Sequence, residues 1–147
     1  MSANEDTFHL GVKAIIRNAG GQILLLKVNV AELTGVSQAY WDIPGGRKQR
    51  GESIEQTLRR EVEEEIGIAT ISDIRPLATV LSDMRIPVKP RDVGLVLAVL
   101  TCKIDPRLSI RLSKEHVAFD WFEPHEAARL LQVVYPASFT ETLRRLA

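Results

Sequence analysis

The order of the elements along the chain predicts an α/β or α+β fold, in which helices pack on a mixed β-sheet. Short runs rich in β-branched and aliphatic residues recur along the sequence, and stretches with helical periodicity interrupt them. Strands, a helix, more strands and a second helix are typical of a layered domain. No internal repeat or break in composition divides the chain, so we expect a single domain over residues 1–147.

Strands are expected wherever an apolar run is bounded by turn residues, at Phe8–Arg17, Gln22–Val28, Ile74–Leu81, Val93–Lys103 and Phe119–Phe122. The cluster Asn18–Gly21 predicts a tight turn that pairs the first two strands antiparallel. A polar, proline-containing loop is expected between the third and fourth strands.

A helix is expected after Ser53, which fits an N-cap with Gln56 three residues later to complete a capping box. Gly67 stands where a C-terminal glycine commonly ends a helix. The helix is expected to face the core through a stripe repeated every four residues, formed by Ile54, Leu58, Val62 and Ile66. Two further helices are expected at Pro124–Leu131 and Ala137–Leu146.

Composition excludes several classes of protein. Nineteen basic residues balance nineteen acidic ones, so no bulk charge draws the chain to nucleic acid or to a membrane. The single cysteine, Cys102, excludes an internal disulfide and lies in an apolar run that predicts burial. No apolar run approaches the roughly 20 residues of a membrane span, and the N-terminal residues do not resemble a signal peptide. We therefore expect a soluble, cytoplasmic monomer or homodimer.

Four glutamates crowd the C-terminal end of the expected helix, in the stretch REVEEEIG. The negative end of the helix dipole disfavours an acid there by roughly 0.3–1 kcal/mol. Glu61, Glu64 and Glu65 fall within an arc of about 100°, Glu65 on the core-facing stripe and Glu63 toward solvent. A solvated acidic face is one interpretation. The other is a site for a hard divalent cation, Mg²⁺ first and Mn²⁺ second.

The spacing of fixed residues favours the cation site. The segment GGRKQRGESIEQTLRREVEEEIGI, residues 45–68, fills every defining position of the Nudix box and resembles the Nudix hydrolase family. The flanking stretches WDIPGG and SKEHVAFDWFEPHEA are also similar to that family. The resemblance implies a Nudix-type α/β/α sandwich. It further implies hydrolysis of a diphosphate linkage in a nucleoside diphosphate joined to another group, so the expected partner is a small nucleotide.

The resemblance also assigns roles to residues. It implies metal ligation by the carboxylates of Glu61, Glu64 and Glu65 and by the backbone carbonyl of Gly45. It implies structural support of the box by Gly46, Glu52, Arg60 and Gly67. Cations of this kind neutralise charge that develops on the oxygens of a diphosphate during attack by water.

The general base is left open between the box acids Glu61 and Glu64 and an acid outside the box, Glu115. Arg47 is a candidate for contact with the phosphates, although a solvated basic loop is an equal alternative. Arg85 and Arg91 lie in the polar loop and are candidates for binding the far end of the substrate. The two histidines that follow, His116 and His125, are predicted to be structural or exposed.

The substrate is not specified by the sequence. Asp83 and Met84 occupy the position where ADP-ribose hydrolases often carry a proline, and no tyrosine follows where dinucleotide hydrolases tend to have one. The short N-terminal region resembles that of nucleoside-triphosphate pyrophosphatases. A ligand-sensing Nudix domain is the alternative function, disfavoured by the complete box. An isoprenoid diphosphate isomerase would need a catalytic cysteine, and Cys102 is expected to be buried.

Overall fold

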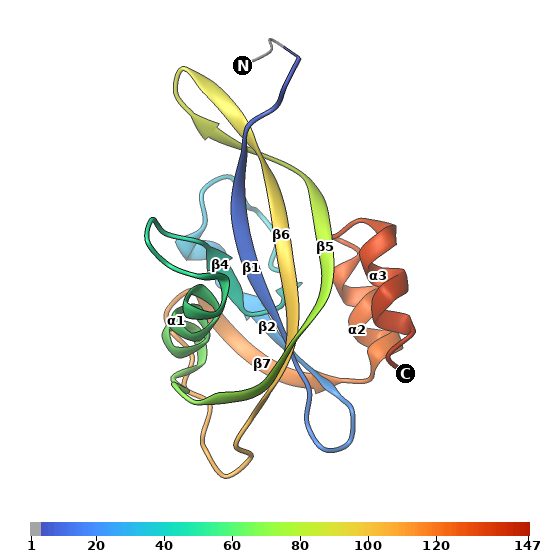
Figure 1. The fold of residues 1–147 in the computed structure, drawn as a ribbon. Coiled ribbons are helices and arrows are strands. Elements are labelled where there is room, and N and C mark those ends of the chain that lie inside the picture. The colour runs from blue at the N-terminus through green and yellow to red at the C-terminus, as the bar shows by residue number, and fades with distance from the viewer. Residues whose placement is uncertain (1–3) are drawn as a thin grey trace.

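A computed structural model describes residues 4–147 and contains two β-sheets with strand orders β4-β1-β6-β5 and β3-β2-β7. Figure 1 shows both sheets in the middle of the molecule, with α1 on one side and α2 and α3 on the other. The strands are β1 (Phe8–Ile16), β2 (Ile23–Val28), β3 (Trp41–Asp42), β4 (Gly45–Arg47), β5 (Ile71–Val88), β6 (Arg91–Ile104) and β7 (His116–Phe122). The helices are α1 (Ile54–Ile66), α2 (Pro124–Leu131) and α3 (Ala137–Arg144), with a short 3-10 helix at Val30–Glu32.

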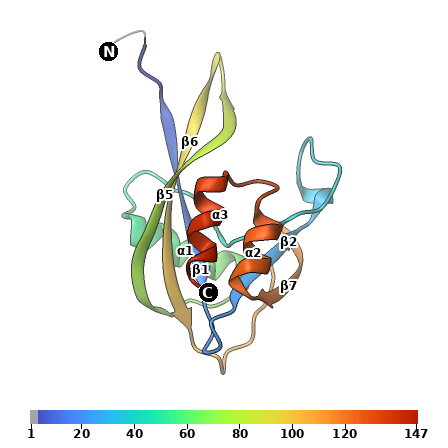
Figure 2. The same cartoon turned by 90° about the vertical axis from the view of Figure 1, so that its right-hand side faces the viewer.

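Two hydrophobic cores lie on opposite sides of the sheets, because successive strand residues face opposite ways. In β2, Leu24 and Leu26 pack toward α1, whereas Ile23 and Leu25 pack toward α2 and α3. This double burial explains why β2 is a continuous apolar run rather than an alternating one. Figure 2 shows α2 and α3 side by side over their face of the sheets. The predicted mixed α+β layered fold is confirmed.

The antiparallel pairing expected between the first two strands is wrong. The turn itself forms, since the Asn18 backbone N–H donates to the Gln22 carbonyl and one bridge joins Arg17 to Ile23. Beyond this bridge the strands separate into different sheets. β1 pairs with β4 and runs parallel to β6, whereas β2 pairs with β3 and β7. Partners distant in sequence outcompete the local hairpin because they bury both faces of each strand.

The prediction of a loop between the third and fourth expected strands is also wrong. β5 continues to Val88 and β6 begins at Arg91, so the segment is a β-hairpin with its turn at Lys89 and Pro90. Figure 1 shows this hairpin extending beyond the body of the molecule, beside the N-terminal segment. Its side chains are largely exposed on both faces, so its sequence lacks the alternation that identifies a half-buried strand.

Other differences are smaller. β3 and β4 were not anticipated, and β7 begins three residues earlier than the expected strand at Phe119. Ile54, expected in the core, is 39% exposed because it occupies the first turn of α1. Burial of Cys102 is confirmed. Within residues 4–147, no helix is long and apolar enough to cross a membrane.

Candidate active site

The start and end of α1 are set by local signals. The Ser53 hydroxyl accepts a hydrogen bond from the Gln56 backbone N–H at 3.1 Å, and the Gln56 side chain accepts one from the Ser53 backbone N–H at 2.8 Å. At the other end Gly67 adopts a left-handed conformation with φ of 74°, which favours glycine. The predicted capping box and terminal glycine are confirmed, and they determine where the glutamates of α1 point.

Glu65 lies on the buried side of α1, as the sequence predicts, and is 6% exposed. Its Oε2 accepts a hydrogen bond from the Gly45 backbone N–H at 2.9 Å. Burial raises the pKa of Glu65 to about 8, although the charge of Lys13 and the Gly45 N–H favour the ionised form. A buried carboxylate of this kind is costly to ionise unless a further positive charge reaches it.

Glu61 lies beside Gly46, in the middle of β4. Its side chain is 13% exposed, and Arg60 Nη1 donates to its Oε1 at 2.8 Å. Burial raises the pKa of Glu61, and the Arg60 hydrogen bond opposes that shift. A Cβ atom at position 46 would lie 2.4 Å from the same Oε1. Gly46 therefore allows the backbone to approach the Glu61 carboxylate without a clash.

Arg60 and Glu52 clamp the loop onto the helix. Arg60 donates through Nε to Glu52 Oε2 at 2.6 Å and through Nη2 to Glu52 Oε1 at 3.0 Å, a bidentate arrangement. Arg60 Nη2 also donates to the backbone carbonyl of Arg47 at 3.2 Å. Hydrogen bonds from Arg60 and from the Gln49 backbone lower the pKa of Glu52 to about 2. These contacts support the structural role predicted for Glu52 and Arg60.

Glu64 differs from the other two predicted ligands of the box. Its side chain is 56% exposed, and its nearest basic partner is Arg60, with Nη1 3.4 Å from Oε1. The neighbouring Glu63 is exposed, as expected. The structure therefore brings Glu61 and Glu65 to the buried face of the site and leaves Glu64 at its edge.

Glu115, the acid outside the box, borders the same cavity as two of the box acids. Together with Glu61 and Glu65 it lines a cavity of about 670 Å³ that is also bordered by β4 and the two residues after it, Lys48 and Gln49. One oxygen of Glu65, one of Glu115 and one ring nitrogen of His116 all lie within 4.8 Å of one another. The expected trio Glu61, Glu64 and Glu65 does not form such a close group. The metal-binding roles of all these residues stay predictions.

A second polar network borders the acids and was not anticipated from the sequence. Lys13 Nζ lies 3.4 Å from Asp42 Oδ2 and donates to the Ile43 carbonyl at 3.3 Å. The Tyr135 hydroxyl donates to the other oxygen of Asp42. Burial lowers the pKa of Lys13, but the charges of Asp42 and Glu65 outweigh it and raise the pKa overall. Lys13 thus stays charged beside the acidic cavity.

A groove adjoins the acidic cavity at Gly46 and Arg47, which line both hollows. The groove encloses about 410 Å³ and is bordered by apolar, aromatic and charged side chains, including Lys13, Tyr40, Met84, Arg85, Leu95, Leu97 and Tyr135. Two of the three predicted substrate-binding arginines, Arg47 and Arg85, therefore share one groove. Arg91 lies at the hairpin turn and lines a separate hollow.

The guanidinium of Arg85 is already engaged in the structure. Its Nη1 lies 2.7 Å from Asp6 Oδ2, and its Nη2 lies 2.9 Å from Asp92 Oδ1. Arg47 is exposed, and its side chain lies 3.5 Å from the His9 ring. Arg47 is therefore the more available of the two for contact with an anion.

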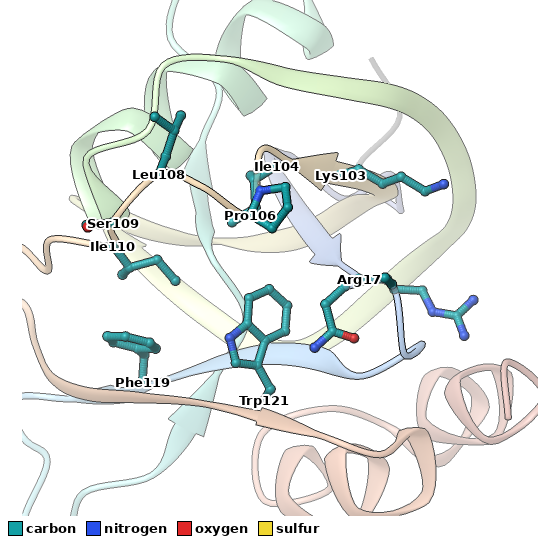
Figure 3. A pocket seen from close by; sticks show the side chains of 11 residues that line it. Arg17, Lys103, Ile104, Pro106, Leu108, Ser109, Ile110, Phe119 and Trp121 are labelled. Carbon is teal, nitrogen blue, oxygen red and sulfur yellow. The ribbon is translucent and has the colours of Figure 1, made fainter.

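Another cavity, of about 730 Å³, shares no lining residue with the acidic cavity. Figure 3 shows Trp121 and Phe119 of β7 facing Pro106 and Ile110 across this hollow. Within residues 4–147, no acidic side chain lines it. Trp121 packs against the core on the α1 side and also borders this cavity.

Comparison with known proteins identifies the family. The profile of the NUDIX domain matches residues 7–143. The chain belongs to the NUDIX domain family. The expectation of a Nudix hydrolase is therefore confirmed, and the elements that carry the acids fall inside the matched region.

The relatives of this Nudix hydrolase include nucleotide-directed proteins. It is 31% identical over 119 residues to the nucleoside triphosphatase NudI of Salmonella typhimurium, covering 78% of this chain and 81% of the relative. The MutT protein of Methanosarcina mazei superposes with a TM-score of 0.69 at 26% identity, covering 98% and 96% of the two chains. The dihydroneopterin triphosphate pyrophosphohydrolase of E. coli shares the fold, with a TM-score of 0.71 at 18% identity over 95% and 96%.

Three residues near the acids of this Nudix hydrolase were not singled out as site residues from the sequence. They are Lys13, Asp42 and His116, and each reaches the site from a different strand. Lys13 had a signal, because it is the one Lys, Arg, Asp or Glu residue of β1 and stands between the buried residues Val12 and Ala14. His116 was expected to be structural or exposed, and only its position next to Glu115 pointed to the site.

Proposed function

We propose that this Nudix hydrolase is a divalent-cation-dependent pyrophosphohydrolase that acts on a nucleoside triphosphate. Water would attack one phosphorus, one phosphoanhydride bond would break, and the products would be a nucleoside monophosphate, pyrophosphate and a proton. The observation that carries the proposal is that the two hollows share lining residues. Gly46 and Arg47 border both the acidic cavity and the groove, so one extended ligand can occupy both.

The groove supports binding of the nucleoside. Its volume of about 410 Å³ lies within the range typical of small-molecule sites. Leu95, Leu97 and Met84 offer apolar surface to a base, and Tyr40 and Tyr135 offer aromatic surface. The phosphates would then extend past Gly46, where the absence of a side chain permits close approach. The similarity to a nucleoside triphosphatase supports the same substrate class.

The acidic cavity supports binding of a hard cation. Glu65 and Glu115 present carboxylate oxygens to one point, and the charges of Glu61 and Asp42 add to theirs. Lys13 neutralises only part of this negative charge. Mg²⁺ or Mn²⁺ fits oxygen donors of this kind, with the Gly45 carbonyl as a further proposed ligand. When bound, such an ion supplies neutralisation of the charge that develops on the phosphate oxygens.

Glu61 is the residue we assign as the proton acceptor for the attacking water. It lines the acidic cavity but stands outside the close group of Glu65, Glu115 and His116. Arg60 holds one of its oxygens and leaves the other free to accept a proton. Arg60 and Glu52 keep the loop in register with α1, and Arg47 is available to pair with a phosphate oxygen. Glu64 is placed at the rim, where it can contact the phosphates only after its side chain moves.

A product assay tests the proposal. Purified protein with Mg²⁺ or Mn²⁺ is incubated with nucleoside triphosphates, nucleotide sugars and dinucleoside polyphosphates, and the products are separated by chromatography. We expect a nucleoside monophosphate and pyrophosphate from at least one triphosphate, with slower release from the other two classes. Binding of nucleotide without turnover would instead favour the ligand-sensing function and would overturn the proposal.

A further inference from the structure

His116 stands in an unusual position for a residue outside the Nudix box. It is the first residue of β7, where it pairs with Val28, and its backbone N–H donates to the Ser113 carbonyl. Glu115 is anchored beside it, because its carbonyl accepts a hydrogen bond from the Asn29 backbone N–H at 2.8 Å. These backbone hydrogen bonds fix the positions of Glu115 and His116 close to Glu65 of α1.

The ring of His116 has a hydrogen-bonding requirement that the protein does not meet. Its Nδ1 is enclosed and makes no hydrogen bond with any group in residues 4–147. A buried polar atom without a partner usually signals a missing water or ion. A ring nitrogen of the same side chain lies within 4.8 Å of carboxylate oxygens from Glu65 and Glu115.

We propose that His116 is a nitrogen ligand which, with Glu65 and Glu115, binds a first-row transition-metal ion in preference to Mg²⁺. This inference rests on the proposed cation-dependent function and specifies which ion the site takes. Two ligands on opposite sides of an ion at about 2.1 Å lie about 4.2 Å apart. The three ligand atoms are already within 4.8 Å of one another, so small side-chain movements bring them onto one ion.

The donor set decides the preference. Mg²⁺ takes oxygen ligands and retains much of its water, whereas imidazole suits transition-metal ions. Affinity for a mixed nitrogen and oxygen site rises from Mn²⁺ toward Co²⁺ and Ni²⁺. Charge also fits, because four acidic side chains line the same hollow as only two lysines; the acids are Glu32, Asp42, Glu65 and Glu115, and the lysines are Lys13 and Lys114. A divalent ion with a neutral imidazole ligand balances that excess.

The test measures metal binding in the absence of nucleotide. Mg²⁺, Mn²⁺ and Co²⁺ are titrated into the unmodified protein and into His116→Gln by calorimetry, with visible absorption as a second readout for Co²⁺. We expect His116→Gln to weaken Co²⁺ binding at least about tenfold while Mg²⁺ binding changes less than twofold. His125→Gln is the matched control, since His125 is exposed on α2, and should change neither affinity. Equal effects on Co²⁺ and Mg²⁺, or no binding of Co²⁺, would overturn the inference.

Two further measurements keep the inference testable if His116→Gln does not fold. His116→Asp replaces the nitrogen donor by oxygen, and it should shift the preference toward Mg²⁺. Pulsed electron paramagnetic resonance of Mn²⁺ in the unmodified protein should detect a coordinated nitrogen, and its absence would contradict the proposal. Hydrolysis is scored separately. A protein that binds Co²⁺ through His116 but hydrolyses no triphosphate would refute the proposed function alone, and the converse result would refute this inference alone.

Discussion

Glu52 and Glu65 are both carboxylates of the Nudix box, and their surroundings shift their acidities in opposite directions. Glu52 accepts two hydrogen bonds from Arg60, and its pKa falls to about 2. Glu65 is buried against the Gly45 backbone, and its pKa rises to about 8. The protein supplies a cationic partner for the first acid. For the second it supplies one backbone N–H and the nearby charge of Lys13, and together these do not offset the effect of burial.

We propose that this difference separates a structural acid, Glu52, from a functional one, Glu65. An acid that holds a loop in place is most useful when its partner belongs to the same chain, as Arg60 does for Glu52. An acid that binds a cation must keep oxygen lone pairs free of other partners until the ion binds. Burying such an acid lowers the free energy of unfolding of the metal-free protein. Glu115 and Glu61 border the same cavity as Glu65, although one oxygen of Glu61 also accepts a hydrogen bond from Arg60.

Glu61→Gln is expected to have the largest effect on catalysis. Loss of the proton acceptor should lower kcat by about 10²–10⁴-fold, because the amide cannot take a proton from water. The metal concentration for half-maximal rate should change little, since Glu65 and Glu115 still hold the ion. Steady-state kinetics with Glu63→Gln as the exposed control measures this. A loss of under about threefold would remove Glu61 from the reaction and move the base to Glu64 or Glu115.

Glu115→Gln is expected to weaken metal binding rather than proton transfer. The Mn²⁺ concentration needed for half-maximal rate should rise by about tenfold or more, while kcat at saturating metal falls less than in Glu61→Gln. A metal titration of the rate distinguishes the two roles. A large loss of kcat with unchanged metal dependence would mean that Glu115 is the base, and no change in either would make it an ordinary surface acid.

A smaller effect is expected on the pH dependence of stability. Between the ordinary value of 4.5 and about 8, folded Glu65 holds a proton that the unfolded chain has released. Stability without metal should therefore fall as pH rises through this window. A bound cation favours the ionised form, so the rise in Tm on adding Mn²⁺ should be larger at pH 8 than at pH 6. Thermal melts in chelator and in Mn²⁺ at both pH values test the sign, and a smaller metal effect at pH 8 would contradict it.

Local signals predicted the part of the fold that depends on neighbouring residues. The capping box at Ser53 and the glycine at position 67 define α1, because both act within one turn of the helix. The pairing of β1 with β6 could not be read in the same way, since it joins residues about ninety positions apart. The turn after Arg17 formed as expected, but it could not determine which sheet each strand would join.

The candidate site also contains features that neighbouring residues determine and features that depend on distant strand pairing. The orientations of Glu61, Glu63 and Glu65 follow from helical geometry, and the burial of Glu65 confirmed the expected side. The grouping of Glu65 with His116 depends on how β7 pairs with β2, which places the start of β7 opposite the helix. No spacing rule within the box contains that information, so a histidine ligand had to come from the three-dimensional structure.

The contrast between the two acids is tested most directly by comparing the melting of Glu65→Gln and Glu52→Gln in chelator and in Mn²⁺. Removing the buried ionisable group should raise the Tm of Glu65→Gln in chelator above that of the unmodified protein by about 4 °C or more, and should abolish the rise caused by Mn²⁺. Glu52→Gln should instead lower the Tm in chelator and keep the metal-induced rise. If Glu65→Gln melted lower in chelator and still gained stability from Mn²⁺, Glu65 would be a structural acid and the account would be wrong.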